Sequence, residues 1–221
     1  MTALKVVFLV FLVGFTTAHL ISSWKDDEKR RKFSKPFIVP CIVAYYFLSA
    51  ETVCWPLVAG LIASWLGDIL LIPKGHKWFA LGGVAFFATH VFFVMTYYPY
   101  IDFACVNWYV TIPVACLYLA ADIFLTVHFR KSTPAVLRPP MSMYIMANGT
   151  MNVFALMMYM TLRNQPALIV YIGAVLFFIS DFSCFSVRYS DLRDYIPKKH
   201  FTVMLTYTVA VFMITQGLLL L

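Results

Sequence analysis

Charged residues are scarce in this chain, and their scarcity argues against an ordinary soluble fold. Only 12% of the 221 residues are charged, while 62% are apolar. Soluble domains have about 25% charged and about 45–50% apolar residues. The few charges are also separated by apolar runs that are long enough to cross a membrane. This composition predicts an all-α membrane protein.

The common catalytic and cofactor motifs are missing as well. The sequence contains no GxSxG nucleophile elbow, no HExxH, no GxxxxGK[ST] phosphate loop and no glycine-rich dinucleotide turn. Its five histidines stand singly, which argues against a zinc or di-iron site, and we expect neither a metal nor an organic cofactor. Its five cysteines include no CxxC pair, so we expect small buried hydrophobic side chains. A disulfide between Cys54 and Cys105, which both lie near helix ends, is the alternative.

Long apolar runs are the feature that the chain does have. A helix needs about 20 such residues to span a bilayer, and eight runs come near that length, at residues 3–23, 34–50, 54–72, 77–98, 105–128, 140–162, 166–187 and 200–220. We predict a bundle of eight transmembrane helices forming one polytopic domain over residues 1–221. The third and seventh runs both have a small residue followed by aspartate near their ends, which suggests a parallel repeat of two four-helix halves.

Lysine and arginine are concentrated in alternate loops. The first, third, fifth and seventh loops hold 15 of the 17 basic residues, and only Lys5 and Arg163 fall on the other side. The positive-inside rule therefore predicts that these loops are cytosolic and that both termini are lumenal or extracytoplasmic. The net charge of +7 then reflects orientation in a bilayer, not binding of nucleic acid. The compartment would be the endoplasmic reticulum membrane in a eukaryote and the cytoplasmic membrane in a bacterium.

Three acidic residues, Asp68, Asp122 and Asp181, fall inside predicted helices. A charged side chain at membrane depth costs roughly 2.5–3.5 kcal/mol on insertion scales, so it normally faces the protein interior or a wet cavity. Each acid lies six to eight residues before a basic helix end, or about 9–12 Å inside the cytosolic boundary. Gly60 and Gly67 lie on the helix face of Asp68, which favours close packing around it. We rank Asp122 below the other two.

Other polar side chains occupy the same helices. Tyr144, Asn148 and Asn152 are spaced by four residues and form a stripe that either lines a cavity or makes hydrogen bonds between helices. Residue counting places His90 about 8–10 Å deeper than the acids, which favours a cavity or packing histidine over a proton partner of Asp68. Tyr207 lies at about the depth of the acids and is a candidate donor to a carboxylate.

Five segments resemble, in order, the signature segments of YhhN-type lysoplasmalogenases. They are GLIASWLGDILLIP (60–73), GGVAFFATHVFF (82–93), PMSMY (140–144), GAVLFFISD (173–181) and TYTVAVFMIT (206–215). The resemblance implies an eight-span enzyme that hydrolyses the vinyl ether bond of lysoplasmalogens. The products would be a fatty aldehyde and glycerophosphoethanolamine or glycerophosphocholine. It implies that Asp68 and Asp181 are the paired acids, and that His90 and Tyr144 match the family's histidine and tyrosine.

The chemistry of a vinyl ether agrees with this set of residues. Such a bond resists bases and nucleophiles but yields to acid, because protonation of its outer carbon gives an oxocarbenium ion that water attacks. Two carboxyls in one poorly hydrated site divide the roles, since one holds a proton while the other stays charged. We expect Asp68 and Asp181 to act as general acid and carboxylate, as paired acids do in glycoside hydrolysis, with the assignment open.

The substrate implied by the resemblance is a lysophospholipid taken from the bilayer. Basic cytosolic loops attract a phosphate, and Lys35 and Arg188 are the candidates, although the positive-inside rule alone also explains them. The chain departs from the family pattern at Phe93 and Val211, where tyrosine and glutamine are frequent. Two polar cavity contacts are therefore absent, and the headgroup and the oligomeric state are left open.

Two other functions are consistent with intramembrane acids. A membrane transporter or proton-coupled carrier would use them as an ion relay, and it would need a cavity that reaches both membrane faces. A pocket open only to the cytosol and its leaflet would favour the hydrolase. An aspartyl intramembrane protease also uses two aspartates on helices, but WLGD matches only half of that family's GxGD motif, and its YD and PAL motifs are missing.

Overall fold

Helices account for most of residues 2–190 and 194–221, which the computed structural model describes. The described residues form α1 (Thr2–Trp24), α2 (Glu28–Ser49), α3 (Trp55–Leu70), α4 (His76–Tyr97), α5 (Trp108–Arg130), α6 (Arg138–Leu162), α7 (Gln165–Tyr189) and α8 (Lys199–Leu219), with no strand among them. Two short 3-10 helices, η1 (Tyr98–Tyr100) and η2 (Ala135–Leu137), follow α4 and precede α6. The all-α class is therefore confirmed.

Six of the described helices, α1 and α4 to α8, are long and apolar enough to cross a membrane. The helix α3 has 16 residues, fewer than the roughly 20 needed for an untilted span. The helix α2 begins at Glu28, ahead of the predicted start at residue 34, because the Asp27 side chain caps it by accepting from the backbone N–H of Arg30. Its first turns are therefore charged. That α2 and α3 also cross the membrane stays a prediction, as does the repeat of two halves.

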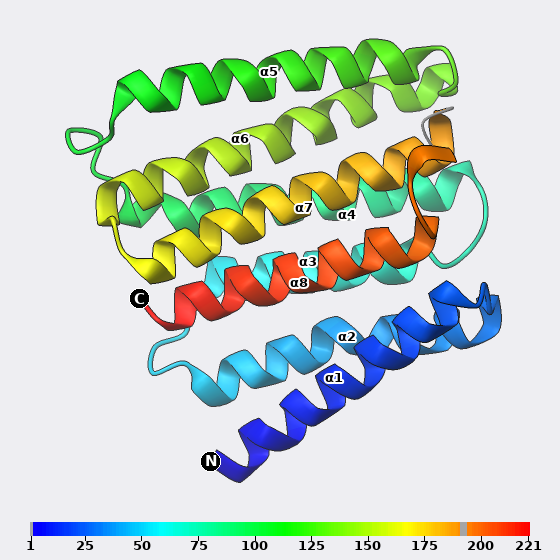
Figure 1. Cartoon of the computed structure of the whole chain (residues 1–221), viewed down its shortest axis with the longest axis horizontal. Helices are drawn as coiled ribbons and strands as arrows, with labels where there is room; N and C mark the ends of the chain where they lie inside the picture. Colours follow the sequence, from blue (N-terminus) through cyan, green and yellow to red (C-terminus); the bar gives the residue numbers. More distant parts are fainter. Residues whose placement is uncertain (1, 191–193) are drawn as a thin grey trace.

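The helices alternate in direction, so both chain termini lie at one end of the bundle (Figure 1). The connections after α1, α3, α5 and α7 gather at the other end. These are the four loops rich in lysine and arginine, and we call this end the basic end. The charge pattern predicted that these four loops lie on one side, and they do. That this side is cytosolic stays a prediction.

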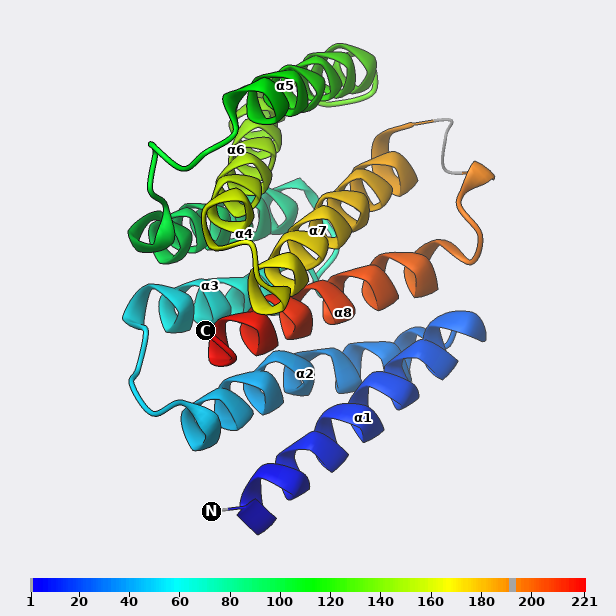
Figure 2. The same ribbon diagram turned by 60° about the vertical axis from the view of Figure 1, so that its left-hand side comes forward.

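The site is built from the centre of the bundle. Helix α3 packs against α4, α7 against α8, and α4 against α6, while α2 contacts both α3 and α8. Helices α1 and α5 lie at opposite edges (Figure 2), and most of their side chains are exposed. Small residues allow the central contact, since a Cβ atom on Gly60 would lie 2.7 Å from the Phe93 ring and one on Gly67 would lie 2.6 Å from Phe86. The predicted close-packed face of α3 is therefore confirmed.

The cysteines differ from expectation. Cys41 is buried, but Cys105 and Cys116 are exposed, and all five thiols are free. The prediction of buried cysteines was wrong for Cys105, which precedes α5, and for Cys116, because α5 turns most of its surface outward. The alternative disulfide of Cys54 with Cys105 is not formed, and the Cys105 thiol instead donates to Asp102 at 3.3 Å.

Candidate functional site

Asp68 and Asp181, which are far apart in the chain, line one cleft of about 70 Å³ inside the bundle. We call it the acidic cleft; Lys35, Tyr144 and Tyr207 also line it. Its other walls are mostly apolar, so the two carboxyls share a poorly hydrated space. The two acids therefore line the same cleft, as the sequence predicted.

Asp68 is held by a lysine and a tyrosine. The Lys35 ammonium lies 3.1 Å from Oδ1 of Asp68, whose side chain is 2% exposed. The Tyr207 hydroxyl donates to Oδ2 at 2.8 Å and lies 2.5 Å from the Ser64 hydroxyl. The expected donation from Tyr207 is therefore confirmed. The contact with Lys35 was missed, because it joins two helices whose relative placement no single-helix pattern reveals.

Asp181 lines the same cleft but has a different set of neighbours. Asn148 donates its side-chain amide to Oδ2 of Asp181 at 2.6 Å, and Tyr144 lines the same cleft. Nε2 of the fully buried His90 lies 3.2 Å from the same oxygen, but it is not aligned for a hydrogen bond. Within the described residues, no lysine or arginine forms an ion pair with this acid.

The contact between His90 and Asp181 corrects the expected depth of the histidine. Residue counting placed it well below the acids, yet the imidazole touches one of them. Side chains lean toward the N-terminus of their own helix. Because α4 and α7 run in opposite directions, His90 and Asp181 lean toward each other. The imidazole also packs edge-on against Tyr144 and Phe177, at ring distances of 5.2 and 5.0 Å.

The polar stripe on α6 both lines a cavity and makes hydrogen bonds to neighbouring helices. Tyr144 lines the acidic cleft, whereas Asn152 lies behind Asn148. The Asn152 amide donates to the side-chain oxygen of Asn148 at 3.0 Å and its own oxygen accepts from Tyr118 at 3.2 Å. Together with the bond from Asn148 to Asp181, these bonds form a chain in which every donor points toward the acid. The chain fixes the orientation of the Asn148 amide.

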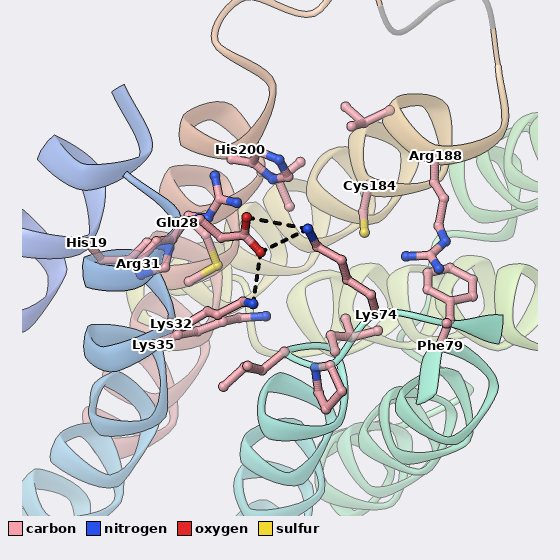
Figure 3. Close-up of a pocket in the computed structure, with 17 residues that line it drawn as sticks. His19, Glu28, Arg31, Lys32, Lys35, Lys74, Phe79, Cys184, Arg188 and His200 are labelled. Atoms are coloured by element: carbon pink, nitrogen blue, oxygen red, sulfur yellow. Dashed lines mark hydrogen bonds and ion pairs between the residues drawn. The ribbon is translucent and has the colours of Figure 1, made fainter. Parts of the chain in front are cut away.

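A larger cavity of about 500 Å³ adjoins the acidic cleft at the basic end (Figure 3). We call it the basic vestibule, and its cationic side chains are Arg31, Lys32, Lys35, Lys74 and Arg188. Lys35 lines both cavities. The guanidinium of Arg188 lies 4.1 Å from the centre of the Phe79 ring. The two predicted cations are therefore present here, together with three that the sequence did not single out because they come from separate segments.

Glu28 is the one acid lining this vestibule among the described residues. Its Oε1 forms ion pairs with the ammonium groups of Lys32 at 2.8 Å and of Lys74 at 3.1 Å (Figure 3). Hydrogen bonds from Lys32 and Lys74, and then their charges, lower the pKa of Glu28 to about 2. The carboxylate thus joins the first turn of α2 to the loop before α4.

Glu28→Gln is expected to lower the melting temperature at pH 7 by no more than a few degrees, because the ion pairs are exposed. A carboxyl whose pKa is lowered by folding stabilises the fold above its unfolded-state pKa, and this is lost as the pH falls through the folded-state value. The difference from the parent protein should shrink between about pH 4.5 and about pH 2. Thermal unfolding at several pH values checks this, with Glu51→Gln at the opposite end as control. A difference that persists at pH 2 would contradict it.

Comparison with known proteins supports one relationship. Neither the curated proteins nor the solved structures compared with this chain include a match. Residues 30–218, by contrast, match the YhhN family. The matched range contains both acids of the cleft and the five segments whose resemblance suggested this relationship. Because the match covers far more than half of the 221 residues, the chain belongs to the YhhN family.

Proposed function

We propose that the protein is a lysoplasmalogenase, which hydrolyses the vinyl ether bond of lysoplasmalogens to a fatty aldehyde and glycerophosphoethanolamine or glycerophosphocholine. The observation that carries the proposal is the pair of acids, Asp68 and Asp181, in one cleft that adjoins a basic vestibule. Membership of the YhhN family supports a hydrolase. The acids suit a bond that is cleaved by protonation, and the vestibule suits a phosphate.

The neighbours of the two acids suggest how the roles are divided. An opposite charge close to a carboxyl favours its charged form. Asp68 has the ammonium of Lys35 at 3.1 Å, whereas Asp181 is held by the neutral amide of Asn148. We assign the charged carboxylate to Asp68 and the proton to Asp181. The assignment leaves the proton on the acid whose side chain is more exposed, 13% against 2%.

The reaction then returns each acid to its starting protonation state. Asp181 protonates the outer vinyl carbon, and the Asp68 carboxylate stabilises the oxocarbenium ion. Water adds to this ion and gives its proton to Asp68. The hemiacetal collapses when Asp181 accepts its hydroxyl proton and Asp68 protonates the glycerol oxygen that leaves. Both acids end in their starting states, and the net change is addition of one water.

The basic vestibule would hold the phosphate of the headgroup. In a lysoplasmalogen the phosphate and the vinyl ether are joined through the three-carbon glycerol backbone, so their sites must be adjacent. Lys35 lines both cavities and marks that junction. Arg31 and Arg188 provide planar guanidinium groups, which suit phosphate oxygens better than an ammonium does.

The packing of the bundle supports a hydrolase over the transporter alternative. A carrier needs a path from the cleft to the end of the bundle where the termini lie. Large side chains on α3, α4 and α6 are fully buried toward that end, among them Leu57, Phe93, Tyr97, Met151 and Met158. The cleft instead joins a cavity at the basic end. The protease alternative has no support beyond the two acids, since the YD and PAL motifs are missing from the sequence.

Purified protein incubated with a lysoplasmalogen is expected to release fatty aldehyde, whereas the saturated ether analogue should release none. The saturated analogue has the same headgroup and chain but no double bond to protonate, so it isolates the proposed chemistry. Aldehyde and water-soluble product can be measured together by mass spectrometry. Absence of aldehyde from both lipids would contradict the proposal. Substrate-dependent proton movement in proteoliposomes without hydrolysis would favour the carrier.

A further inference from the structure

An apolar groove of about 260 Å³ lies between the first turns of α4 and α6 and adjoins the acidic cleft. We call it the α4–α6 groove. The part of its lining that the argument uses is Phe79, Gly83 and Val84 from α4, and Met141 and Met143 from α6. No charged side chain is found among its lining residues within the described chain. The groove therefore suits hydrocarbon.

The groove is continuous with the acidic cleft. Phe79, Gly83, Tyr144 and Phe185 line both. Phe79 also lines the basic vestibule, so three cavities of different character meet at its ring. The acidic cleft thus connects the basic vestibule with the α4–α6 groove. That order matches the phosphate, the reacting bond and the chain of a single-chain amphiphile.

The outer rim of the groove faces away from the protein. Val84 is 57% exposed and Met143 is 58% exposed. Both lie on helices that are long and apolar enough to span a membrane. Exposed apolar side chains on such helices contact lipid tails. The groove thus opens sideways toward the bilayer, not toward water.

We propose that the α4–α6 groove binds the hydrocarbon chain of the substrate, which reaches the acids from the bilayer through the gap between these two helices. The chemical identity of that chain as an alkenyl chain rests on the proposed function. The headgroup then remains at the basic end while the chain lies along Val84 and Met143. Burial of successive methylene groups in the groove selects long chains over short ones.

Gly83 controls the passage between the cleft and the groove. It lines both cavities, and a Cβ atom placed on it would meet no atom within 4 Å. A side chain at this position therefore extends into the passage without disturbing the packing of α4. The neighbouring Gly82 is different, because its Cβ atom would lie 2.8 Å from Leu71.

Gly83→Leu is expected to lower kcat/KM for a hexadecenyl lysoplasmalogen by about tenfold or more, because the long chain loses its buried path. A butenyl lysoplasmalogen, whose chain ends near the cleft, should lose much less, and Gly83→Ala should lie between Gly83→Leu and the parent. Gly14→Leu on α1 is the matched control, since a Cβ atom there also meets no atom within 4 Å. An unchanged ratio of long-chain to short-chain turnover in Gly83→Leu would overturn the proposal.

A second measurement needs no turnover and separates this inference from the proposed function. A saturated ether lysophospholipid with a diazirine near its chain end should label peptides of α4 and α6 after irradiation. Labelling should disappear in Gly83→Leu but persist in Gly14→Leu. Labelling of these helices without any aldehyde production supports the groove and contradicts the vinyl ether hydrolase. Aldehyde production with labelling confined to other helices would support the vinyl ether hydrolase and contradict binding of the chain in the α4–α6 groove.

Discussion

Asp181→Asn is expected to reduce aldehyde release from a lysoplasmalogen by about 10²–10⁴-fold, the usual contribution of a general acid. Asparagine keeps the size of the side chain and an oxygen for the amide of Asn148, but it has no acidic proton to give to carbon. The protein should remain folded, because Asp181 takes part in no ion pair with lysine or arginine among the described residues. Product analysis by mass spectrometry gives the rate, and size-exclusion chromatography gives the folded fraction.

Asp122→Asn is the matched control for this loss. Asp122, like Asp181, is an acid on an apolar helix, and it is 4% exposed. It packs against Gly149, where an added Cβ atom would collide with its Oδ2, and it is not among the residues that line the acidic cleft. Activity should stay within about twofold of the parent. An equal loss in both variants would mean that removal of a buried carboxyl, and not of a proton donor, explains the effect.

The assignment of roles is tested by comparison with Asp68→Asn, which should also be strongly impaired. In Asp181→Asn the residual reaction must take its proton from solvent, so its rate should rise about tenfold for each unit that the pH falls. In Asp68→Asn the proton donor is still present, and what is lost is stabilisation of the cation. Its residual rate should therefore not rise tenfold for each unit that the pH falls. The reverse pattern would exchange the roles of the two acids.

The acids themselves were found from local sequence patterns. An aspartate in an apolar helix is costly wherever it lies, so Asp68 and Asp181 stand out without any knowledge of tertiary structure. Gly60 and Gly67 indicated the inward face of α3 because small residues recur there at helical spacing, and their close contacts with α4 confirm it. Both signals are contained within one helix, which is why sequence alone was sufficient.

The partners of the acids were harder to predict because they depend on how helices are placed relative to one another. Lys35 was interpreted as a phosphate ligand, and its contact with Asp68 follows from the packing of α2 on α3. The depth of His90 was wrong because counting residues ignores the opposite lean of side chains on antiparallel helices. The passage at Gly83 depends on empty space between α4 and α6, which no periodicity records.

Lys35→Met is expected to lower the free energy of unfolding by about 3–5 kcal/mol, the usual cost of leaving one partner of a buried ion pair without the other. Methionine is also long and unbranched, so packing changes little while the charge is lost. Asp68, at 2% exposure, then remains in a mostly apolar cleft where the Tyr207 hydroxyl is its one donor among the described residues. The loss should be smaller in Lys35→Met combined with Asp68→Asn, because the second change removes the unpaired charge.

The coupling between the two changes, measured by denaturant unfolding of both single variants and the double variant, should be about 1–3 kcal/mol. Lys199 and Asp194 form the matched pair, because they have the same separation of 3.1 Å but are 41% and 69% exposed. Lys199→Met and Asp194→Asn should show a coupling of about 0–1 kcal/mol, since water screens the charges. Equal coupling in the two pairs would mean that Lys35 and Asp68 are hydrated. The charged Asp68 would then need no help from Lys35, and the reason for placing the proton on Asp181 would be lost.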